Sequence, residues 1–523
     1  MTRWDAIVIG SGFGGAVTAC RLAERGLKVL VLERGRRWSP ETYPRGSSGA
    51  WIWDQNAPRQ FNGWVDLRLY RGMAVAQGAA VGGGSLIYAN VSVPPNPDLF
   101  DSGWPEEITF DEMSPYFDRV GKMLNVQTIP ENQLTERFKL VREAAEKIGA
   151  GDRFRPLPLA VTFDPEWDAD RPDPTSFEHS RSWINDQGQE QGTCVHCGDC
   201  CTGCVVKAKN TLDLNYIPLA EQHGAEVRPL HLVQALTPVK GGYQVDFQRL
   251  DTGQLGMETS ERVILAAGSL GSTEILLRSR DEHCNMPGLS LLLGKKWSSN
   301  GDFLTPGFYR GRRISPTHGP TISSAIDFLD GSEGPKFFIE DGGWPDVLRQ
   351  HLETGFNLRD GGRRWQIIFS AFGQLLRTRD PQSQVMPWFA QGVDAGDGEL
   401  SLRRIPWQPW RKRLHLKWRV QKSRAVIDGI VAMHQKLAAA TDGRAPVPPA
   451  WQVFKWLVTP HPLGGCVMGT TADDGVVNHA GEVFGYRGLY VADGAIIPKP
   501  IGLTPSRTIA GLAERISDQI VAA

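Results

Sequence analysis

The residues best suited to chemistry include a histidine that is followed at once by a glycine-rich turn. His461 opens the run His461-Pro-Leu-Gly-Gly-Cys-Val-Met468. An imidazole titrates near neutral pH, so it can accept or orient the proton of a hydroxyl. A lone histidine beside proline is more often structural, so a catalytic assignment needs support from the rest of the chain.

A second group with chemical potential is a cluster of cysteines in the middle of the chain. Five of the eight cysteines occupy eleven residues. Four of them have the C-x2-C-x2-C-x3-C spacing of bacterial ferredoxins: Cys194, Cys197, Cys200 and Cys204. Clustered thiolates can converge on an iron–sulfur cluster or on zinc. A metal-free structural loop is the alternative, because ferredoxin clusters usually take their fourth cysteine from elsewhere and cysteine also packs as a small hydrophobe.

These groups need a scaffold, and its strongest signal lies between Asp5 and Gly35. This stretch is typical of a strand, a glycine turn, a helix and a second strand, with apolar runs at 6–9 and 29–32. The G-x-G-x-x-G spacing lets backbone approach a pyrophosphate at the helix N-terminus, and an acid 23 residues after the first glycine suits a ribose. We therefore expect a dinucleotide site, and not a turn with only a packing role, at Gly10, Gly12, Phe13, Gly14, Gly15 and Glu33.

Two later segments also favour close contact between backbone and a cofactor. Residues 75–90 combine glycine and alanine with Ser85, and the strand near 263 ends in Ala266-Ala267-Gly268 before a helix through Arg278. A simple tight turn is the alternative at 75–90, but an upstream dinucleotide site favours a loop along the cofactor. The cofactor contacts expected here are Gly78, Gly82, Gly83, Ser85, Val233, Ala267 and Gly268.

The last segment predicts a short strand that ends in Asp493, followed by a helix to about residue 521. Thr504 fits the cap of this helix, and Pro505 fits its first turn. If the helix N-terminus points at the cofactor, its dipole stabilises negative charge there. We therefore add Asp493, Gly494, Thr504 and Pro505 to the expected cofactor contacts.

Length and charge narrow the class of protein. The chain has 523 residues, too many for one simple core, so at least two lobes are expected. Its 57 basic and 58 acidic residues give no global attraction to nucleic acid or anionic membrane. The sequence shows no apolar run long enough to span a bilayer and no signal peptide. We therefore expect a cytoplasmic enzyme without nucleic-acid partners or integral membrane association.

Hydrophobic patterns predict how the chain is divided. Amphipathic helices are expected at 110–126 and 134–149, a long ordered loop or lid at 153–191, a helix at 210–224, and a strand pair at 226–227 and 231–236. Beyond residue 303, alternating segments predict a separate antiparallel lobe. Its strands are expected at 303–309, 321–328, 336–340, 365–374, 384–390, 399–402 and 414–420, with a helix at 423–440.

In this order, the N-terminal fingerprint, Gly82-Gly-Gly-Ser85, Ala266-Ala-Gly268, His461-Pro-Leu-Gly-Gly465 and Tyr490-Val-Ala-Asp-Gly494 resemble the glucose–methanol–choline (GMC) oxidoreductase family. The likeness is closest to its cholesterol-oxidase-like branch and covers nearly the whole chain. It implies an α/β fold, with a Rossmann-like FAD-binding domain built from discontinuous segments and a substrate lobe with a largely antiparallel sheet. It also implies oxidation of an alcohol carbon by hydride transfer to flavin N5.

The same resemblance implies domain limits. Residues 1–95 form the first FAD-binding part, 96–190 a helical and loop lid region, and 191–302 the cysteine-rich loop with the second FAD-binding part. Residues 303–455 form the substrate lobe, and 456–523 complete the FAD-binding domain and the active site.

The resemblance assigns catalytic roles to residues that match the family's motifs. His461 matches the histidine that holds the substrate hydroxyl, and Glu340 is placed like the carboxylate that serves as a base in sterol oxidases, although an exposed turn carboxylate is the alternative. Two positions depart from the family pattern. Thr504 stands where an Asn or His is usual, so the second catalytic role is in doubt. Tyr88 stands where many relatives have Asn, so flavin contacts there can differ.

The sequence therefore predicts an FAD-dependent enzyme that oxidises a hydrophobic alcohol, such as a sterol, with His461, Thr504 and Glu340 at the active site. Electrons would pass to oxygen or to an external acceptor. One alternative is a flavin dehydrogenase that relays electrons through a cysteine-bound iron–sulfur centre. Another is a flavin-binding scaffold with weakened chemistry. A plain nicotinamide dehydrogenase fits least, because it would not require the later glycine segments.

Overall fold

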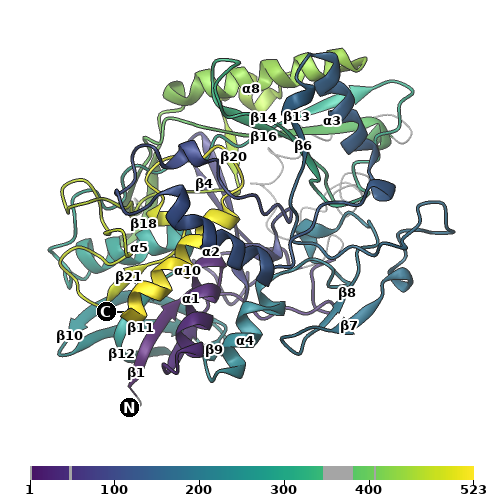
Figure 1. Ribbon diagram of the computed structural model, residues 1–523. Coiled ribbons are helices and arrows are strands. Elements are labelled where there is room, and N and C mark those ends of the chain that lie inside the picture. The colour runs from purple at the N-terminus through teal and green to yellow at the C-terminus, as the bar shows by residue number, and fades with distance from the viewer. Residues whose placement is uncertain (1–2, 46–49, 346–380, 406–407, 523) are drawn as a thin grey trace.

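A seven-stranded sheet forms the base of the molecule in the computed structural model, which describes residues 3–45, 50–345, 381–405 and 408–522 (Figure 1). Its strand order is β10-β11-β12-β1-β2-β9, and β21 pairs with β12. The strands are β1 (Trp4–Ile9), β2 (Val29–Leu32), β9 (Glu226–Arg228), β10 (His231–Val239), β11 (Gly242–Arg249), β12 (Leu255–Leu265) and β21 (Leu489–Val491). Segments from both ends and the middle of the chain thus share one sheet, so the discontinuous Rossmann-like domain is confirmed.

The centre of this sheet is parallel because its short apolar strands are covered on both faces. β1 and β2 are almost wholly buried, and β1 pairs in parallel with both β2 and β12. The predicted strands at 226–227 and 231–236 exist, but their pairing was wrong. β9 lies parallel to β2, whereas β10 is antiparallel to β11. The two strands instead extend opposite ends of the sheet.

A second sheet of six antiparallel strands forms the predicted lobe. Its order is β19-β13-β16-β15-β14-β6. The strands are β6 (Phe154–Pro156), β13 (Phe303–Tyr309), β14 (Ser324–Phe328), β15 (Phe337–Asp341), β16 (Val385–Gly392) and β19 (Gly443–Arg444). Helices α3 (Glu136–Lys147) and α8 (Val420–Ala440) cover it (Figure 1).

The boundaries of this lobe differ from the sequence prediction in two ways. β17 (Glu399–Ile405) and β18 (Gln408–Lys417) form a separate hairpin that packs on α5 (Gly268–Asp281), so they do not extend the lobe's sheet. The expected loop at 153–191 contributes β6 to the lobe. It also begins a small hairpin of β7 (Ser182–Ile184) and β8 (Glu190–Gly192). The strand expected at 365–374 lies outside the described residues.

A four-stranded sheet links the N-terminal glycine loop to the histidine segment. It contains β3 (Ile52–Trp53), β4 (Val65–Tyr70), β5 (Met73–Gly78) and β20 (Leu457–Thr459). β20 lies parallel to β5, with Thr459 opposite Val75. This pairing, which the sequence patterns did not predict, brings residue 461 beside the end of β5.

Further helices lie close to their predicted positions. α1 (Phe13–Glu24) packs on the seven-stranded sheet, α10 (Ser506–Ala522) packs on α1, and α2 (Phe110–Met123) packs on α10 (Figure 1). The helix expected at 210–224 is shorter, because a 3-10 turn at 212–214 precedes α4 (Tyr216–Gln222). α10 begins at Ser506, so Thr504 and Pro505 precede the helix. Across the described parts of the chain, we find no helix with the length and apolarity needed to cross a membrane.

One buried carboxylate joins four of the helices. Glu514 on α10 is fully buried and accepts two hydrogen bonds of 2.8 Å from Arg21 on α1. It also accepts from Arg119 on α2 at 3.0 Å and from the Tyr216 hydroxyl on α4 at 2.8 Å. A buried carboxylate with this many donors is stable only while its partners remain in place. Glu514 therefore ties the C-terminal helix to the dinucleotide-binding part of the chain.

We expect Glu514→Ala to lower the free energy of unfolding by about 3–5 kcal/mol, because it leaves the Arg21 guanidinium without its buried counter-charge. Asp518→Ala is the matched control, since Asp518 lies on the same helix and also forms a salt bridge with Arg119, at 3.3 Å. Its side chain is more exposed than that of Glu514. Its expected cost is below about 1 kcal/mol. Chemical denaturation of both variants measures the difference, and equal losses would contradict the role of Glu514.

Candidate active site

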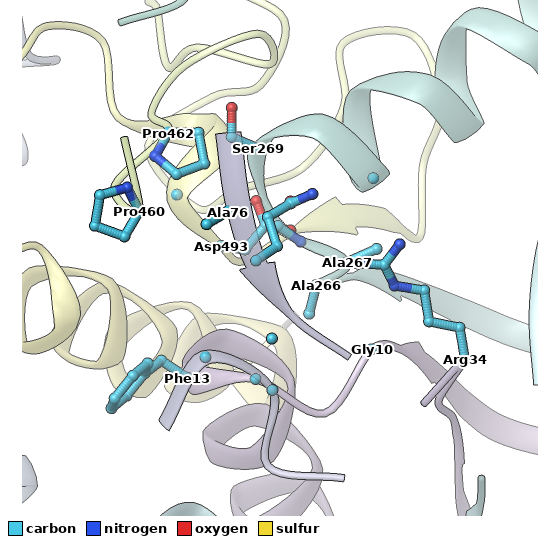
Figure 2. Close-up of a pocket in the computed structure, with 18 of the residues that line it drawn as sticks. Gly10, Phe13, Arg34, Ala76, Ala266, Ala267, Ser269, Pro460, Pro462 and Asp493 are labelled. Atoms are coloured by element: carbon cyan, nitrogen blue, oxygen red, sulfur yellow. The ribbon is translucent and has the colours of Figure 1, made fainter. Parts of the chain in front are cut away.

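A cavity of about 750 Å³ lies where the carboxyl ends of the parallel strands meet the six-stranded sheet. Figure 2 shows residues from distant parts of the chain around the same space, among them Gly10, Phe13, Pro460 and Asp493. Most of the predicted site residues line it: Gly10, Gly12, Phe13, Gly14, Glu33, Gly78, Gly83, Val233, Ala267, Gly268, His461, Asp493, Gly494, Thr504 and Pro505. Four predicted residues, Gly15, Gly82, Ser85 and Glu340, lie behind this wall.

Glycines, which have no side chain, let three segments of the chain meet at one end of the cavity. A Cβ on Gly14 would lie 1.7 Å from the carbonyl oxygen of Ala492, and a Cβ on Gly15 would lie 2.0 Å from that of Gly10. Gly10 has a φ of +97°, and a Cβ there would lie 2.4 Å from the Ala266 oxygen. The glycine turn therefore packs directly on the ends of β12 and β21, and any side chain would separate them.

The N-terminus of α1 opens onto the cavity, and no side chain caps it. Gly12 precedes the helix, gives no side-chain cap, and the first turn contains no acid. Its free N–H groups and the helix dipole therefore suit a phosphate. Glu33 is buried beside this turn and accepts hydrogen bonds from the backbone and hydroxyl of Ser11 at 2.9 and 2.7 Å. Its Oε1 accepts from the Gly35 N–H at 2.8 Å, which fixes the position of the carboxylate.

The second glycine loop presses against the first. A Cβ on Gly83 would lie 2.5 Å from the Gly12 Cα, so these two backbones touch. Ser85 supports the loop from behind, because its hydroxyl donates to Gly82 at 2.7 Å and accepts from Leu212 at 3.1 Å. Ser85 and Gly82 therefore shape the wall without facing the cavity.

Asp493 connects the ends of β12 and β21 at the middle of the cavity. Its carboxylate accepts from the Gly268 N–H and the Ala495 N–H, both at 2.8 Å, and from the Ser272 hydroxyl at 2.5 Å. Burial raises the pKa of Asp493 to about 6, although these hydrogen bonds oppose the shift. The predicted acid thus lies in the wall, where it also positions the start of α5.

His461 is oriented by a carboxylate that sequence reasoning missed. Its Nδ1 lies 2.8 Å from Asp302 Oδ1, and its backbone N–H donates to the Thr459 hydroxyl at 2.9 Å. That hydroxyl donates in turn to Asp302 Oδ2 at 2.5 Å. Because a carboxylate only accepts, a proton belongs on Nδ1, and in the neutral imidazole Nε2 is then an acceptor. Asp302 is 159 residues from His461 and lies in no motif, so no sequence signal identifies it.

Thr504 reaches the cavity because a buried asparagine holds the preceding segment. Asn300 Oδ1 accepts from the backbones of Ile501 and Gly502 at 3.1 and 2.9 Å, and its Nδ2 donates to the Leu503 carbonyl at 2.8 Å. Asn300 is fully buried and lies two residues before Asp302. The same stretch of chain therefore positions both Thr504 and His461.

Glu340 is not an exposed turn residue, because it lies fully buried on β15. Its Oε2 accepts from Gln391 Nε2 at 2.8 Å, and Gln391 lines the cavity where Glu340 does not. Burial raises the pKa of Glu340 to about 8, with smaller contributions from Asp341 and Asp302, while the bond from Gln391 opposes the shift. Sequence patterns gave no signal for Gln391.

The cysteine cluster is not arranged as a metal site. In residues 3–45, 50–345, 381–405 and 408–522, no three or more His, Cys, Asp or Glu side chains are grouped to hold a metal ion. Burial raises the pKa of the Cys194, Cys197 and Cys204 thiols. The iron–sulfur interpretation of Cys194, Cys197, Cys200 and Cys204 therefore does not fit this geometry. The carbonyl of Cys200 instead accepts a hydrogen bond from the buried Lys209, a contact of 2.5 Å.

Tyr88, which stands where many relatives have Asn, places an aromatic ring in the cavity wall. Its ring meets that of Phe13 edge-on at 5.4 Å, and its hydroxyl donates to the Asn210 carbonyl at 2.9 Å. Beyond it, Leu304 and Phe389 of the six-stranded sheet give that side of the cavity an apolar surface. The two sides of the cavity therefore differ: glycine backbone on one, apolar side chains on the other.

Comparison with known proteins gives relatives over almost the whole chain. The GMC oxidoreductase family profile matches residues 395–513, and that of the NAD(P)-binding Rossmann-like domain matches residues 8–63. A cholesterol oxidase from Acinetobacter baumannii is 30% identical over 99% of this chain and 94% of its own length. One from Mycobacterium tuberculosis is 32% identical over 98% and 90%. A long-chain-alcohol oxidase from Arabidopsis thaliana is 24% identical over 99% and 67%.

Solved structures share the fold at lower identity. A pyridoxine 4-oxidase from Mesorbium loti has a TM-score of 0.64 at 14% identity and covers 100% of both chains. A fungal aryl-alcohol oxidase has a TM-score of 0.60 at 15% identity and covers 100% of this chain and 99% of its own. These values establish the common fold.

The residues of the cavity fit FAD, the cofactor of this family. The uncapped helix suits the pyrophosphate, Glu33 suits the ribose, and the glycines leave room for both beside the backbone. The volume of about 750 Å³ is that of a ligand pocket. Full-length relatives at 30% identity and more confirm the expected resemblance. The chain therefore belongs to the GMC oxidoreductase family, and it is an FAD-dependent oxidoreductase that acts on CH–OH donors.

Proposed function

We propose that the enzyme oxidises the hydroxyl-bearing carbon of a hydrophobic alcohol, such as a sterol. The observation that carries this proposal is the His461–Asp302 pair, whose imidazole lines the cavity with its ring centroid 6.5 Å from that of Phe389. The apolar side, with Leu304 and Phe389, suits a hydrocarbon body. The names of the relatives, cholesterol oxidase and long-chain-alcohol oxidase, support the same substrate class.

In this proposal His461 accepts the proton of the substrate hydroxyl at Nε2. Asp302 holds the proton on Nδ1, so that Nε2 keeps its lone pair facing the substrate and the imidazolium formed by transfer is stabilised. The bound flavin supplies the hydride acceptor at N5. The burial of Asp302 excludes water from the carboxylate–imidazole contact, which strengthens it.

Thr504 stands where the family usually has an Asn or His as the second active-site residue. Its hydroxyl can donate a hydrogen bond to the substrate oxygen or accept one from it, but it cannot serve as a base. We propose that it orients the substrate and leaves proton transfer to His461. Glu340 has a supporting role, because Gln391 stands between it and the cavity.

Oxygen is the electron acceptor that we propose. Relatives named as oxidases support it, and the alternative relay would require a cysteine-bound centre that this geometry does not fit. A panel of sterols, long-chain alcohols and sugars, mixed with the enzyme without air, tests the substrate class by bleaching of the flavin absorbance. Admission of air then tests the acceptor. Bleaching by sugars alone would overturn the hydrophobic substrate, and a flavin that stays bleached in air would overturn the oxidase.

We expect His461→Ala to slow anaerobic flavin reduction by about 10²-fold or more, because the hydroxyl proton loses its acceptor. Asp302→Asn should also slow it, since an amide can donate to Nδ1 and so move the proton to Nε2. Rapid-mixing absorbance measurements give both rates. The control is His223→Gln, an exposed histidine at the end of α4, which should reduce at the normal rate. A normal rate in His461→Ala would refute its assigned role.

Thr504→Val removes one hydroxyl with little change in shape, so we expect flavin reduction to slow by roughly 3- to 10-fold, the worth of one hydrogen bond. Thr504→Ser keeps the hydroxyl and should remain close to the parent rate. The same rapid-mixing assay measures both. Equal rates in the two variants would mean that the hydroxyl does not contact the substrate.

A further inference from the structure

Two buried side chains on the lobe side of the cavity each leave one oxygen without a hydrogen-bond partner among the described residues. They are Glu340 Oε1 on β15 and Gln391 Oε1 on β16. Both residues are 0% exposed, and their other polar atoms meet each other, with Gln391 Nε2 donating to Glu340 Oε2 at 2.8 Å. An unpaired buried acceptor is unfavourable, so two in one contact require an explanation.

A single proton on Glu340 removes both deficits. An ionised carboxylate can only accept, and so can an amide oxygen, so neither unpaired oxygen can act as a donor to the other. A carboxylic acid instead has one O–H donor. Primary amide and carboxylic acid are complementary, because the amide N–H donates to one carboxyl oxygen while the acid O–H donates to the amide oxygen. The hydrogen bond from Gln391 Nε2 to Glu340 Oε2 is the first half of that arrangement.

The charges around Glu340 also oppose its ionisation. Asp341 follows it on β15, and Asp302 lies at the start of β13 on the far side of β16. The nearby cation, Arg137 of α3, is bound to Asp341 and to the carbonyls of His318, Pro320 and Thr321. His434 of α8 is buried, and burial lowers its pKa to about 3, so it is neutral. Within the described part of the chain, Glu340 has no ion-pair partner.

We propose that Glu340 is a carboxylic acid at neutral pH and that Gln391 holds it as a hydrogen-bonded acid–amide pair. Gln391 is then a positioning residue that keeps Glu340 from acting as a base. Burial raises the pKa of Glu340 to about 8, so the acid loses its proton only in alkaline solution. Ionisation would place a second negative charge near Asp302 and hence near His461. The effect of this pair on catalysis rests on the proposed function, whereas the protonation state does not.

Infrared spectroscopy of the FAD-loaded enzyme tests the proton directly. A protonated carboxyl has a C=O band separate from that of carboxylates. We expect this band at pH 7, its disappearance in wild type between pH about 7 and about 9.5, and its absence from Glu340→Gln. The pH difference spectrum of wild type needs no variant. A spectrum at pH 7 without a band that depends on Glu340 would overturn the proposal.

The role of Gln391 is tested by the frequency of that band. In Gln391→Leu the acid loses its amide partner, so the band should shift toward the frequency of a free acid. Gln244→Leu is the matched control, since Gln244 Nε2 also donates to a carboxylate, Asp246 Oδ1, at 2.8 Å on another sheet. The control should leave the band unchanged. An unshifted band in Gln391→Leu would overturn the pairing.

Kinetics separates this inference from the proposed function. If Glu340 is a neutral acid at pH 7, the rate of flavin reduction in wild type should change between pH 7 and about 9.5, and Glu340→Gln should lose this pH dependence. A loss of about 10²-fold at pH 7 would show an ionised base and overturn the inference. If no alcohol bleaches either protein, the proposed function fails, and the infrared result still decides the protonation state.

Discussion

The close contact of backbone with backbone at Gly14 is the constraint on which the rest of the structure depends. The carbonyl of Ala492 occupies the space that a Cβ on Gly14 would fill, and Gly10 and Gly15 meet each other and Ala266 in the same way. This contact brings the first helix, the end of β12 and the end of β21 to one point. Because of it, the helix N-terminus, Asp493 and the segment before α10 share a cavity wall. A methyl group at any of these positions would force the wall apart.

Buried carboxylates also join distant segments, because each accepts hydrogen bonds from donors in another part of the chain. Glu514 joins α10 to α1, α2 and α4, while Asp302 joins the six-stranded sheet to His461. Glu340 differs from both, because an amide and not a cation or imidazole faces it. These environments explain why three buried acids in one molecule have different roles: a structural tie, an orienting group and a neutral acid. Charge in a protein interior is decided by the partners that surround it.

Much of the fold could be predicted from local pattern. β2 begins and ends where its apolar run does, and α2, α8 and α10 lie within a few residues of their expected limits. Errors arose where pairing depends on distant residues. The strands at 226–228 and 231–239 join opposite ends of one sheet, and the hairpin at 399–417 packs on α5 instead of joining the lobe. The cysteine spacing left a metal centre and a metal-free loop open, and the described residues show no group of three or more potential ligands that could hold a metal ion.

The sequence by itself determined the dinucleotide fingerprint, the family motifs and the histidine, because glycine spacing, an acid at a strand end and a short motif are local properties. Only the tertiary structure decided what makes these residues an active site. Asp302, Asn300 and Gln391 belong to no motif, and they act through contacts with residues 51 to more than 150 positions away. Such contacts depend on strand register and on which segments the glycines allow to meet. Spacing along one chain cannot express that information, so the orientation of His461 and the proton on Glu340 emerge only in the folded molecule.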